Sequence, residues 1–190
     1  MMHYLGGSIN LLGNDALLRY GGAFIKAYER FLKGLENGDF VYTNEEEMRC
    51  YLFSEYIKYL QENDFPRPYH IFVDYKVDGR KIDLVIQIVE EKVEKVIAIE
   101  VKLDPALSGI EEDLIKLREM IEKGLAIRGI FITLAFSDYQ LKKRLKEEGV
   151  FSKFGLNADG KGDRGFVQWR TIKTPYTSKS IDALYIILWK

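Results

Sequence analysis

Three charged residues lie within strand-like sequence, where apolar side chains are expected. Glu100 and Lys102 stand two residues apart in the stretch VIAIEVKLD, and Asp83 interrupts the apolar run KIDLVI. Side chains alternate between the two faces of a strand, so Glu100 and Lys102 share a face that is opposite to Val101. Because unpaired charges are costly to bury, these residues must be exposed, paired or used in binding.

The preceding strand completes this charged set. Its apolar side chains are expected on the face opposite to Asp83, and they are Ile82, Leu84, Ile86 and Ile88. If both strands direct their apolar faces to one core, then Asp83, Glu100 and Lys102 project together from the other side.

Two carboxylates and an ammonium at one place could bind a metal and act on a phosphate. Close carboxylates repel each other unless a cation joins them, and a hard cation such as Mg²⁺ prefers oxygen ligands. An ammonium beside that cation can stabilise charge that develops on a phosphate, or position a water. The alternative is an exposed cross-strand ion pair, which contributes little to stability.

Helices are expected before this strand-rich stretch. Apolar residues recur at helical spacing over residues 14–38, which predicts one helix, or two helices broken at glycines 21–22. Thr43 and Glu46 have the spacing of a capping box, so a second helix should cover residues 44–61.

Strands and helices follow in a recognisable order. Ser108 with Glu111, and Ser137 with Gln140, have capping-box spacing, and the Asp-Gly pair at 78–79 is a favoured hairpin turn. The order predicts an α/β fold with a mixed central sheet flanked by helices. The expected elements are strands over 70–77, 81–89 and 95–103, a helix after Pro105, a strand covered on both faces over 127–136, a basic helix over 138–149, and strands over 166–172 and 181–189.

The pair of motifs KIDLVI and IAIEVK resembles the PD-(D/E)xK nuclease superfamily, also called the restriction-endonuclease-like fold. That family has an acidic residue on its second core strand and Glu-x-Lys on its third, which Asp83, Glu100 and Lys102 match. The similarity covers about residues 44–136 and follows the family's core order of helix, three strands, helix and strand (αβββαβ). Ile82 stands where the family name would place a proline.

The resemblance implies a metal-dependent nuclease that hydrolyses phosphodiester bonds, in DNA more often than in RNA. Asp83, Glu100, Glu45 and the backbone carbonyl of Val101 would hold one or two Mg²⁺ or Mn²⁺ ions, and Lys102 would orient or activate the water. Many members act as homodimers. The alternative is a nucleic-acid-binding or assembly module that keeps the fold without turnover.

The choice of Glu45 combines the resemblance with helical phase. Many members carry a glutamate on the helix before the sheet, often four residues before an arginine, as Glu45 precedes Arg49. At about 100° per residue, Glu45 heads the apolar stripe that must face the sheet. Glu46 is the second choice and Glu55 the third, and a favourable charge at the helix N-terminus is the alternative role for Glu45.

Composition fits one globular domain of 190 residues with net charge -1 and 47% hydrophobic residues. We expect a helical N-terminal extension over residues 1–42, a core over 43–136, and a C-terminal part over 137–190. The single cysteine, Cys50, and the lack of a signal-peptide pattern favour a reducing cytoplasm. No apolar run is long enough to span a bilayer, so no membrane partner is expected.

Charge is distributed unevenly along the chain. Residues 138–190 hold eleven Lys and Arg against six Asp and Glu. Because a nuclease needs cations to hold phosphates, we expect nucleic acid to contact this part, although a solvated basic face is the alternative. The residues expected to bind it are Lys142, Lys143, Arg144, Arg164, Arg170 and Lys173.

Overall fold

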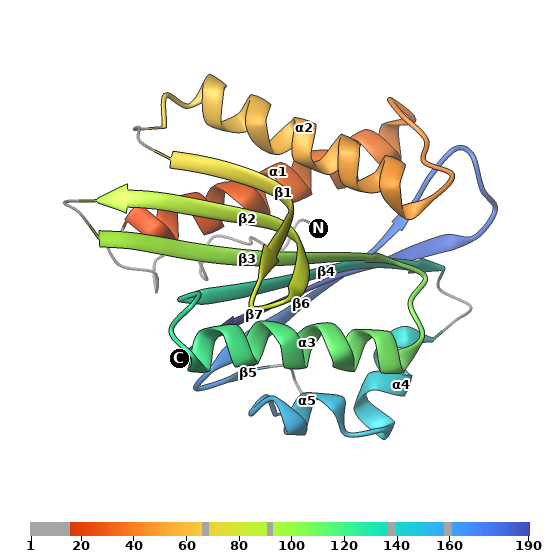
Figure 1. Cartoon of the computed structure of the whole chain (residues 1–190). Coiled ribbons are helices and arrows are strands. Elements are labelled where there is room, and N and C mark those ends of the chain that lie inside the picture. The colour runs from red at the N-terminus through yellow and green to blue at the C-terminus, as the bar shows by residue number, and fades with distance from the viewer. Residues whose placement is uncertain (1–15, 66–68, 91–92, 137–139, 158–160) are drawn as a thin grey trace.

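The computed structural model describes residues 16–65, 69–90, 93–136, 140–157 and 161–190. These residues form an α/β fold in which one mixed sheet lies between two layers of helices (Figure 1), as the order of elements predicts. The seven strands of the described residues are β1 (Tyr69–Val77), β2 (Arg80–Glu90), β3 (Val93–Leu103), β4 (Arg128–Phe136), β5 (Lys161–Gly162), β6 (Gly165–Lys173) and β7 (Ser180–Trp189). The five helices are α1 (Ala16–Asn37), α2 (Glu45–Glu62), α3 (Leu107–Glu122), α4 (Leu141–Glu147) and α5 (Val150–Lys153).

The strands are ordered β1-β2-β3-β4-β7-β6-β5 across the sheet. β3 and β4 are parallel and are connected by α3, whereas the other neighbouring pairs are antiparallel. Residues 129–135 of β4 are all buried, which confirms the prediction of a strand covered on both faces. The short β5 and α5 are not among the predicted elements.

The helices cover both faces of the sheet. α1 and α2 pack on one face, and α3, α4 and α5 pack on the other (Figure 1). On β3, Ile97, Ile99 and Val101 pack with α1 and α2, while Ala98 packs with α3. This alternation confirms the predicted faces of β3, and it directs Glu100 to the α3 side.

α1 is one helix that continues through the glycine pair at 21–22. Tyr20, Ala23 and Phe24 around the pair are buried against the rest of the core. Burial of the two aromatic side chains outweighs the cost of the two glycines, which is about 1 kcal/mol each. No helix in the described part of the chain is both long and apolar enough to cross a membrane.

The capping residues of α2 differ from the prediction by one position. Asn44 caps the helix, and its side chain accepts a hydrogen bond from the backbone N–H of Glu47 at 2.9 Å. Glu47 in turn accepts from the backbone N–H of Thr43 at 2.7 Å. The predicted box of Thr43 with Glu46 is therefore wrong, and Glu46 pairs with Arg49 instead.

The other two predicted capping boxes also fail. α3 begins at Leu107 after Ala106, which has no side chain that can cap, so Ser108 already lies in the first turn. α4 begins at Leu141 after Gln140, which has a left-handed backbone conformation and whose side chain makes no capping hydrogen bond. Ser137 lies outside the described residues.

The β1–β2 hairpin turns as predicted but then departs from simple alternation. The Asp78-Gly79 turn has positive φ at both residues, 51° and 76°. Asp74 also has a positive φ, 54°, and lies across from Asp83. Ile82 packs with the α3-side cluster, whereas Leu84 packs with α1 and α2. The predicted face of Ile82 is therefore wrong. The predicted common face of Asp83 and Glu100 is not found either, since Asp83 contacts Arg49 of α2 and Glu100 contacts Lys116 of α3, on the other face of the sheet.

Candidate active site

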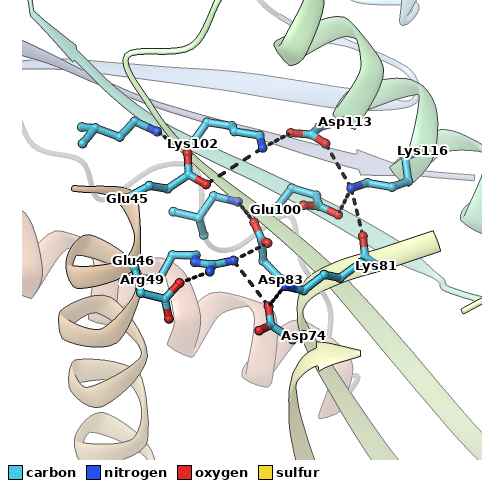
Figure 2. Close-up of polar contacts among 12 residues, drawn as sticks. Glu45, Glu46, Arg49, Asp74, Lys81, Asp83, Glu100, Lys102, Asp113 and Lys116 are labelled. Carbon is cyan, nitrogen blue, oxygen red and sulfur yellow. Dashed lines mark hydrogen bonds and ion pairs between the residues drawn. The ribbon is translucent and has the colours of Figure 1, made fainter. Parts of the chain in front are cut away.

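The charged motif residues lie where β2 and β3 separate (Figure 2). The ladder between these strands ends at the pair Leu84 and Ile99, and Asp83 and Glu100 are the next residues beyond it. Asp83 instead accepts a hydrogen bond from the backbone N–H of Val101, with 2.9 Å between N and Oδ2. We call this place the fork, defined by Asp83, Glu100 and Val101.

Glu100 is the most buried charged residue of the fork. It is 1% exposed, and its Oε1 lies 2.5 Å from Nζ of Lys116 on α3. Burial is the main cause that raises the pKa of Glu100 to about 8, and the charge of Asp83 raises it further, while Lys116 opposes the shift without cancelling it. Near neutral pH this carboxyl group can therefore hold a proton or release it.

Asp83 is held by an arginine from α2. Arg49 donates to Oδ1 of Asp83 at 2.6 Å, and the same nitrogen lies 3.5 Å from Oδ1 of Asp74. The Arg49 side chain is largely buried, which by itself lowers its pKa, but the hydrogen bond with Glu46 and the charges of Asp83 and Asp74 raise that pKa above its ordinary value. Arg49 thus joins α2 to the hairpin and fixes the orientation of Asp83.

Lys102 and Glu45 meet at the end of β3. The Lys102 ammonium lies 4.0 Å from Oε1 of Glu45 and 3.6 Å from Oδ2 of Asp113. Oε2 of Glu45 accepts a hydrogen bond from the backbone N–H of Leu103 at 3.1 Å. Glu45 therefore approaches the fork from the N-terminus of α2, as helical phase predicts.

The alternative glutamates of α2 lie elsewhere. Glu46 is exposed and pairs with Arg49, and Glu55 lies 3.8 Å from the ammonium of Lys58 on the same helix. Neither contacts Lys102. The arrangement selects Glu45 among the three glutamates considered.

Two residues of α3 belong to the site and were not predicted from the sequence. Asp113 is 6% exposed, and its Oδ1 lies 3.0 Å from Nζ of Lys116. The sequence did contain a pattern that indicates burial of Asp113. This residue follows Ile110 by three positions and precedes Leu117 by four, which places it in the buried stripe of the helix. Nothing in the local sequence distinguishes Lys116 from an exposed helical lysine.

The fork and its neighbours form an alternating set of charges. Their side chains, drawn in Figure 2, are the carboxylates of Glu45, Asp83, Glu100 and Asp113 and the cations Arg49, Lys102 and Lys116. Among the described residues, no three acidic, histidine or cysteine side chains are close enough together to form a ready-made metal site. The cations of Arg49 and Lys116 instead contact the carboxylates of Asp83 and Glu100.

Oxygen atoms that could serve a metal are nevertheless present. Oδ2 of Asp113 is buried and makes no hydrogen bond to the described residues, and Oε1 of Glu100 is buried with the ammonium of Lys116 2.5 Å away. Carboxylate oxygens are the ligands that Mg²⁺ and Mn²⁺ prefer, so the donor set fits a hard cation if the arginine or lysine contacts loosen.

The basic residues expected to hold nucleic acid have varied surroundings. On α4, the ammonium of Lys142 lies 5.6 Å from the ring centre of Trp169, and Lys143 lies 3.8 Å from Glu147. Arg144 stands in the last turn of α4. Arg164 and Lys173 are exposed, and Arg164 lines a cavity of about 510 Å³ beside α3.

Arg170 differs from the other basic residues because acidic residues of α1 already bind it. Its guanidinium lies 3.2 Å from Oε2 of Glu29 and also pairs with Glu36. A phosphate would have to compete with both carboxylates for this side chain.

Comparison with known proteins adds no relative from which a role could be transferred. No protein-family model, curated protein or solved structure matches this chain. The chemistry of the fork therefore follows from the contacts of its own residues.

Proposed function

We propose that this protein is a metal-dependent nuclease, a hydrolase of phosphodiester bonds with DNA as the expected substrate, built on a restriction-endonuclease-like core. In this proposal α2, β1, β2, β3, α3 and β4 correspond to the αβββαβ core. The observation that carries the proposal is that Asp83 bonds to the backbone of Val101, between Glu100 and Lys102 on β3, and that Glu45 reaches the same end of β3 from another element.

The electrostatics of the fork favour a functional role over a structural one. Buried ion pairs stabilise folded proteins weakly, because desolvation offsets most of the attraction. Glu100 is buried beside another carboxylate, and its pKa is raised to about 8 as a result. Strongly shifted carboxyl groups occur preferentially at functional sites, where their ionisation is used.

The proposed cation site consists of Asp83, Glu100, Glu45 and the backbone carbonyl of Val101. When bound, a divalent cation would polarise the scissile phosphate and make the attacking water more acidic. Lys102 would stabilise negative charge on the phosphate or hold the water, since its ammonium is partly exposed and stands beside Glu45. Arg49 would act as a positioning residue that orients the carboxylate of Asp83.

A second candidate function is a nucleic-acid-binding or assembly module without turnover. The observation in its favour is that Arg49 already contacts Asp83 and that Lys116 already contacts Glu100. Such a network would hold α2 and α3 against the sheet without any metal.

Cleavage assays separate these two functions. The purified protein would be incubated with linear, nicked, branched and single-stranded DNA in the presence of Mg²⁺, Mn²⁺ or a chelator. The nuclease proposal expects cleavage that requires the metal, and it expects Asp83→Asn to lower both cleavage and Mn²⁺ affinity because one ligand oxygen loses its charge. DNA binding without cleavage under any of these conditions would instead support the module.

A further inference from the structure

The ammonium of Lys116 occupies a cage of oxygens contributed by three elements. It lies 2.5 Å from Oε1 of Glu100 on β3 and 3.0 Å from Oδ1 of Asp113 on α3. It also donates to the backbone carbonyl of Lys81 on β2 at 3.1 Å (Figure 2). A site that surrounds one cation with carboxylate and carbonyl oxygens has the ligand chemistry of a hard metal ion.

This cage holds more acceptor capacity than Lys116 uses. Asp113 is only 6% exposed, and its Oδ2 makes no hydrogen bond to the described residues. The ammonium of Lys102 lies 3.6 Å from that oxygen. Oε1 of Glu100 likewise makes no hydrogen bond of good geometry, although Lys116 is close.

We propose that Lys116 is a built-in counter-ion that competes with the divalent cation for Glu100. The inference rests on the proposed function, because it requires a cation that binds Glu100. In the metal-free protein, Lys116 is the partner of Glu100 whenever that carboxyl group is ionised, and without Lys116 the charge would be buried unpaired. When Glu100 becomes a metal ligand, Lys116 must leave it, because an ammonium and a divalent cation repel each other at this range.

Asp113 gives the displaced ammonium a place to remain. It lies three residues before Lys116 on the same helix, so the pair can persist without movement of α3. The flexible stem of lysine allows its ammonium to move while the Cα atom stays fixed. The cost of breaking the contact between Lys116 and Glu100 therefore lowers the affinity for the cation.

A calorimetric titration with Mn²⁺ tests this proposal at fixed ionic strength and at pH 8.5, above the pKa of about 8 of Glu100, so that competition from protons is weakened. Lys116→Met should bind Mn²⁺ about tenfold more tightly than the wild type, because one competing charge is removed a few ångströms from the cation. Lys123→Met is the matched control: it also removes one positive charge, at the C-cap of α3, where its ammonium contacts Asp78 at 2.6 Å and not Glu100. Its affinity should stay within about twofold of the wild type.

The outcomes distinguish this proposal from the function on which it rests. Equal or weaker Mn²⁺ affinity of Lys116→Met would overturn the counter-ion role, while binding by the wild type would leave the metal site in place. Absence of Mn²⁺ binding in both proteins would remove the metal site itself, and with it the proposed nuclease.

A measurement on the wild type covers the case in which Lys116→Met does not fold. The ¹⁵N signal of the Lys116 ammonium can be identified by its loss in Lys116→Arg and followed during a Mg²⁺ titration. It should shift as Mg²⁺ binds, whereas the ammonium of Lys123, which lies 2.6 Å from Asp78, should not. A Lys116 signal that stays unchanged at saturating Mg²⁺ overturns the proposal.

Discussion

Asp83 has partners for both of its carboxylate oxygens before any metal binds. Oδ2 accepts from the N–H of Val101, and Oδ1 accepts from Arg49. A cation at the fork must share one of these oxygens or displace the arginine. We therefore expect a lower metal affinity than that of a site whose carboxylates have no other partners.

At the residue scale, Lys102→Ala should abolish cleavage while DNA affinity remains nearly unchanged. One cation beside the reacting phosphate acts mainly on the transition state, whereas affinity is distributed over many phosphate contacts. Single-turnover cleavage combined with filter binding measures both quantities. Lys123→Ala, which removes a lysine paired with Asp78 in the hairpin turn, is the control and should cleave normally. Cleavage at wild-type rate by Lys102→Ala would exclude a role for this ammonium.

Glu100 makes metal binding depend on pH. Its pKa of about 8 means that the carboxyl group carries a proton at neutral pH, and that proton must leave when a cation binds. Mn²⁺ binding at pH 7 should therefore release about one proton, and affinity should rise with pH until it levels off above about pH 8. Calorimetry in two buffers of different ionisation enthalpy measures the release, and Glu100→Gln is the control that should show none. A binding enthalpy that is independent of the buffer would contradict this assignment.

The same shift has a defined effect on stability. A carboxyl group with a raised pKa in the folded state stabilises the protein fully below its ordinary pKa of 4.5, and this contribution is lost as pH rises through about 8. The glutamine of Glu100→Gln does not ionise, so this variant does not lose that contribution. Its free energy of unfolding relative to that of the wild type should therefore increase as pH rises from 4.5 to above 8. Urea unfolding of both proteins at pH 5 and pH 8.5 makes the comparison.

At the scale of elements, α2 is held to the β1–β2 hairpin through Arg49. Arg49→Met leaves the carboxylate of Asp83 largely buried without its cation, so we expect a loss of about 3 kcal/mol in the free energy of unfolding. Asp83→Asn in the same chain should recover much of that loss, because no charge then remains to be neutralised. A double-mutant cycle by urea unfolding measures the coupling, and additive effects would show that the two side chains do not interact.

α4 provides the element-scale test for nucleic-acid binding. Replacement of Lys142, Lys143 and Arg144 by alanine should weaken DNA binding and reduce its salt dependence by up to about 0.9 log unit per lost phosphate contact. Cleavage at saturating DNA should persist, since the fork is unchanged. The matched control replaces Lys26, Lys33 and Lys58, three exposed lysines of α1 and α2. An unchanged salt slope for the α4 variant would mean that α4 is only a solvated basic face.

At the scale of the whole molecule, the expectation of one domain can be tested by unfolding. The C-terminal strands β6 and β7 continue the sheet from β4, and Leu184 and Ile186 share a cluster with Leu114 and Leu117 of α3. We therefore expect one cooperative transition. Both tryptophans, Trp169 and Trp189, lie in β6 and β7, so fluorescence reports on this part while far-UV circular dichroism reports on the whole. Separate midpoints for the two signals would indicate that the C-terminal part unfolds independently.

A homodimer belongs to the same scale and stays a prediction by analogy. In a homodimer, each of the two active sites can cut one strand of a duplex, whereas a single active site must cut the two strands one after the other. Sedimentation with and without a DNA duplex would measure the stoichiometry. A protein that remains a monomer on DNA and still cuts both strands would exclude a dimer as a requirement.

The sequence by itself determined the features that depend on short-range periodicity. Alternation in β3 placed Glu100 and Lys102 on one face, the Asp-Gly pair at 78–79 fixed the hairpin turn, and helical phase separated Glu45 from the other glutamates of α2. These features follow from the geometry of single strands, turns and helices, which neighbouring residues specify.

Only the tertiary structure decided which distant charges meet. Arg49 and Asp83 are 34 residues apart in the sequence. Lys116 contacts Glu100 from α3, and the sequence around this lysine looks the same as that around an exposed helical lysine. The turned end of β2 moved Ile82 to the α3 side, and the order β4-β7-β6 completed the sheet. Such contacts depend on how elements pack and twist against one another, and local periodicity carries no information about that packing.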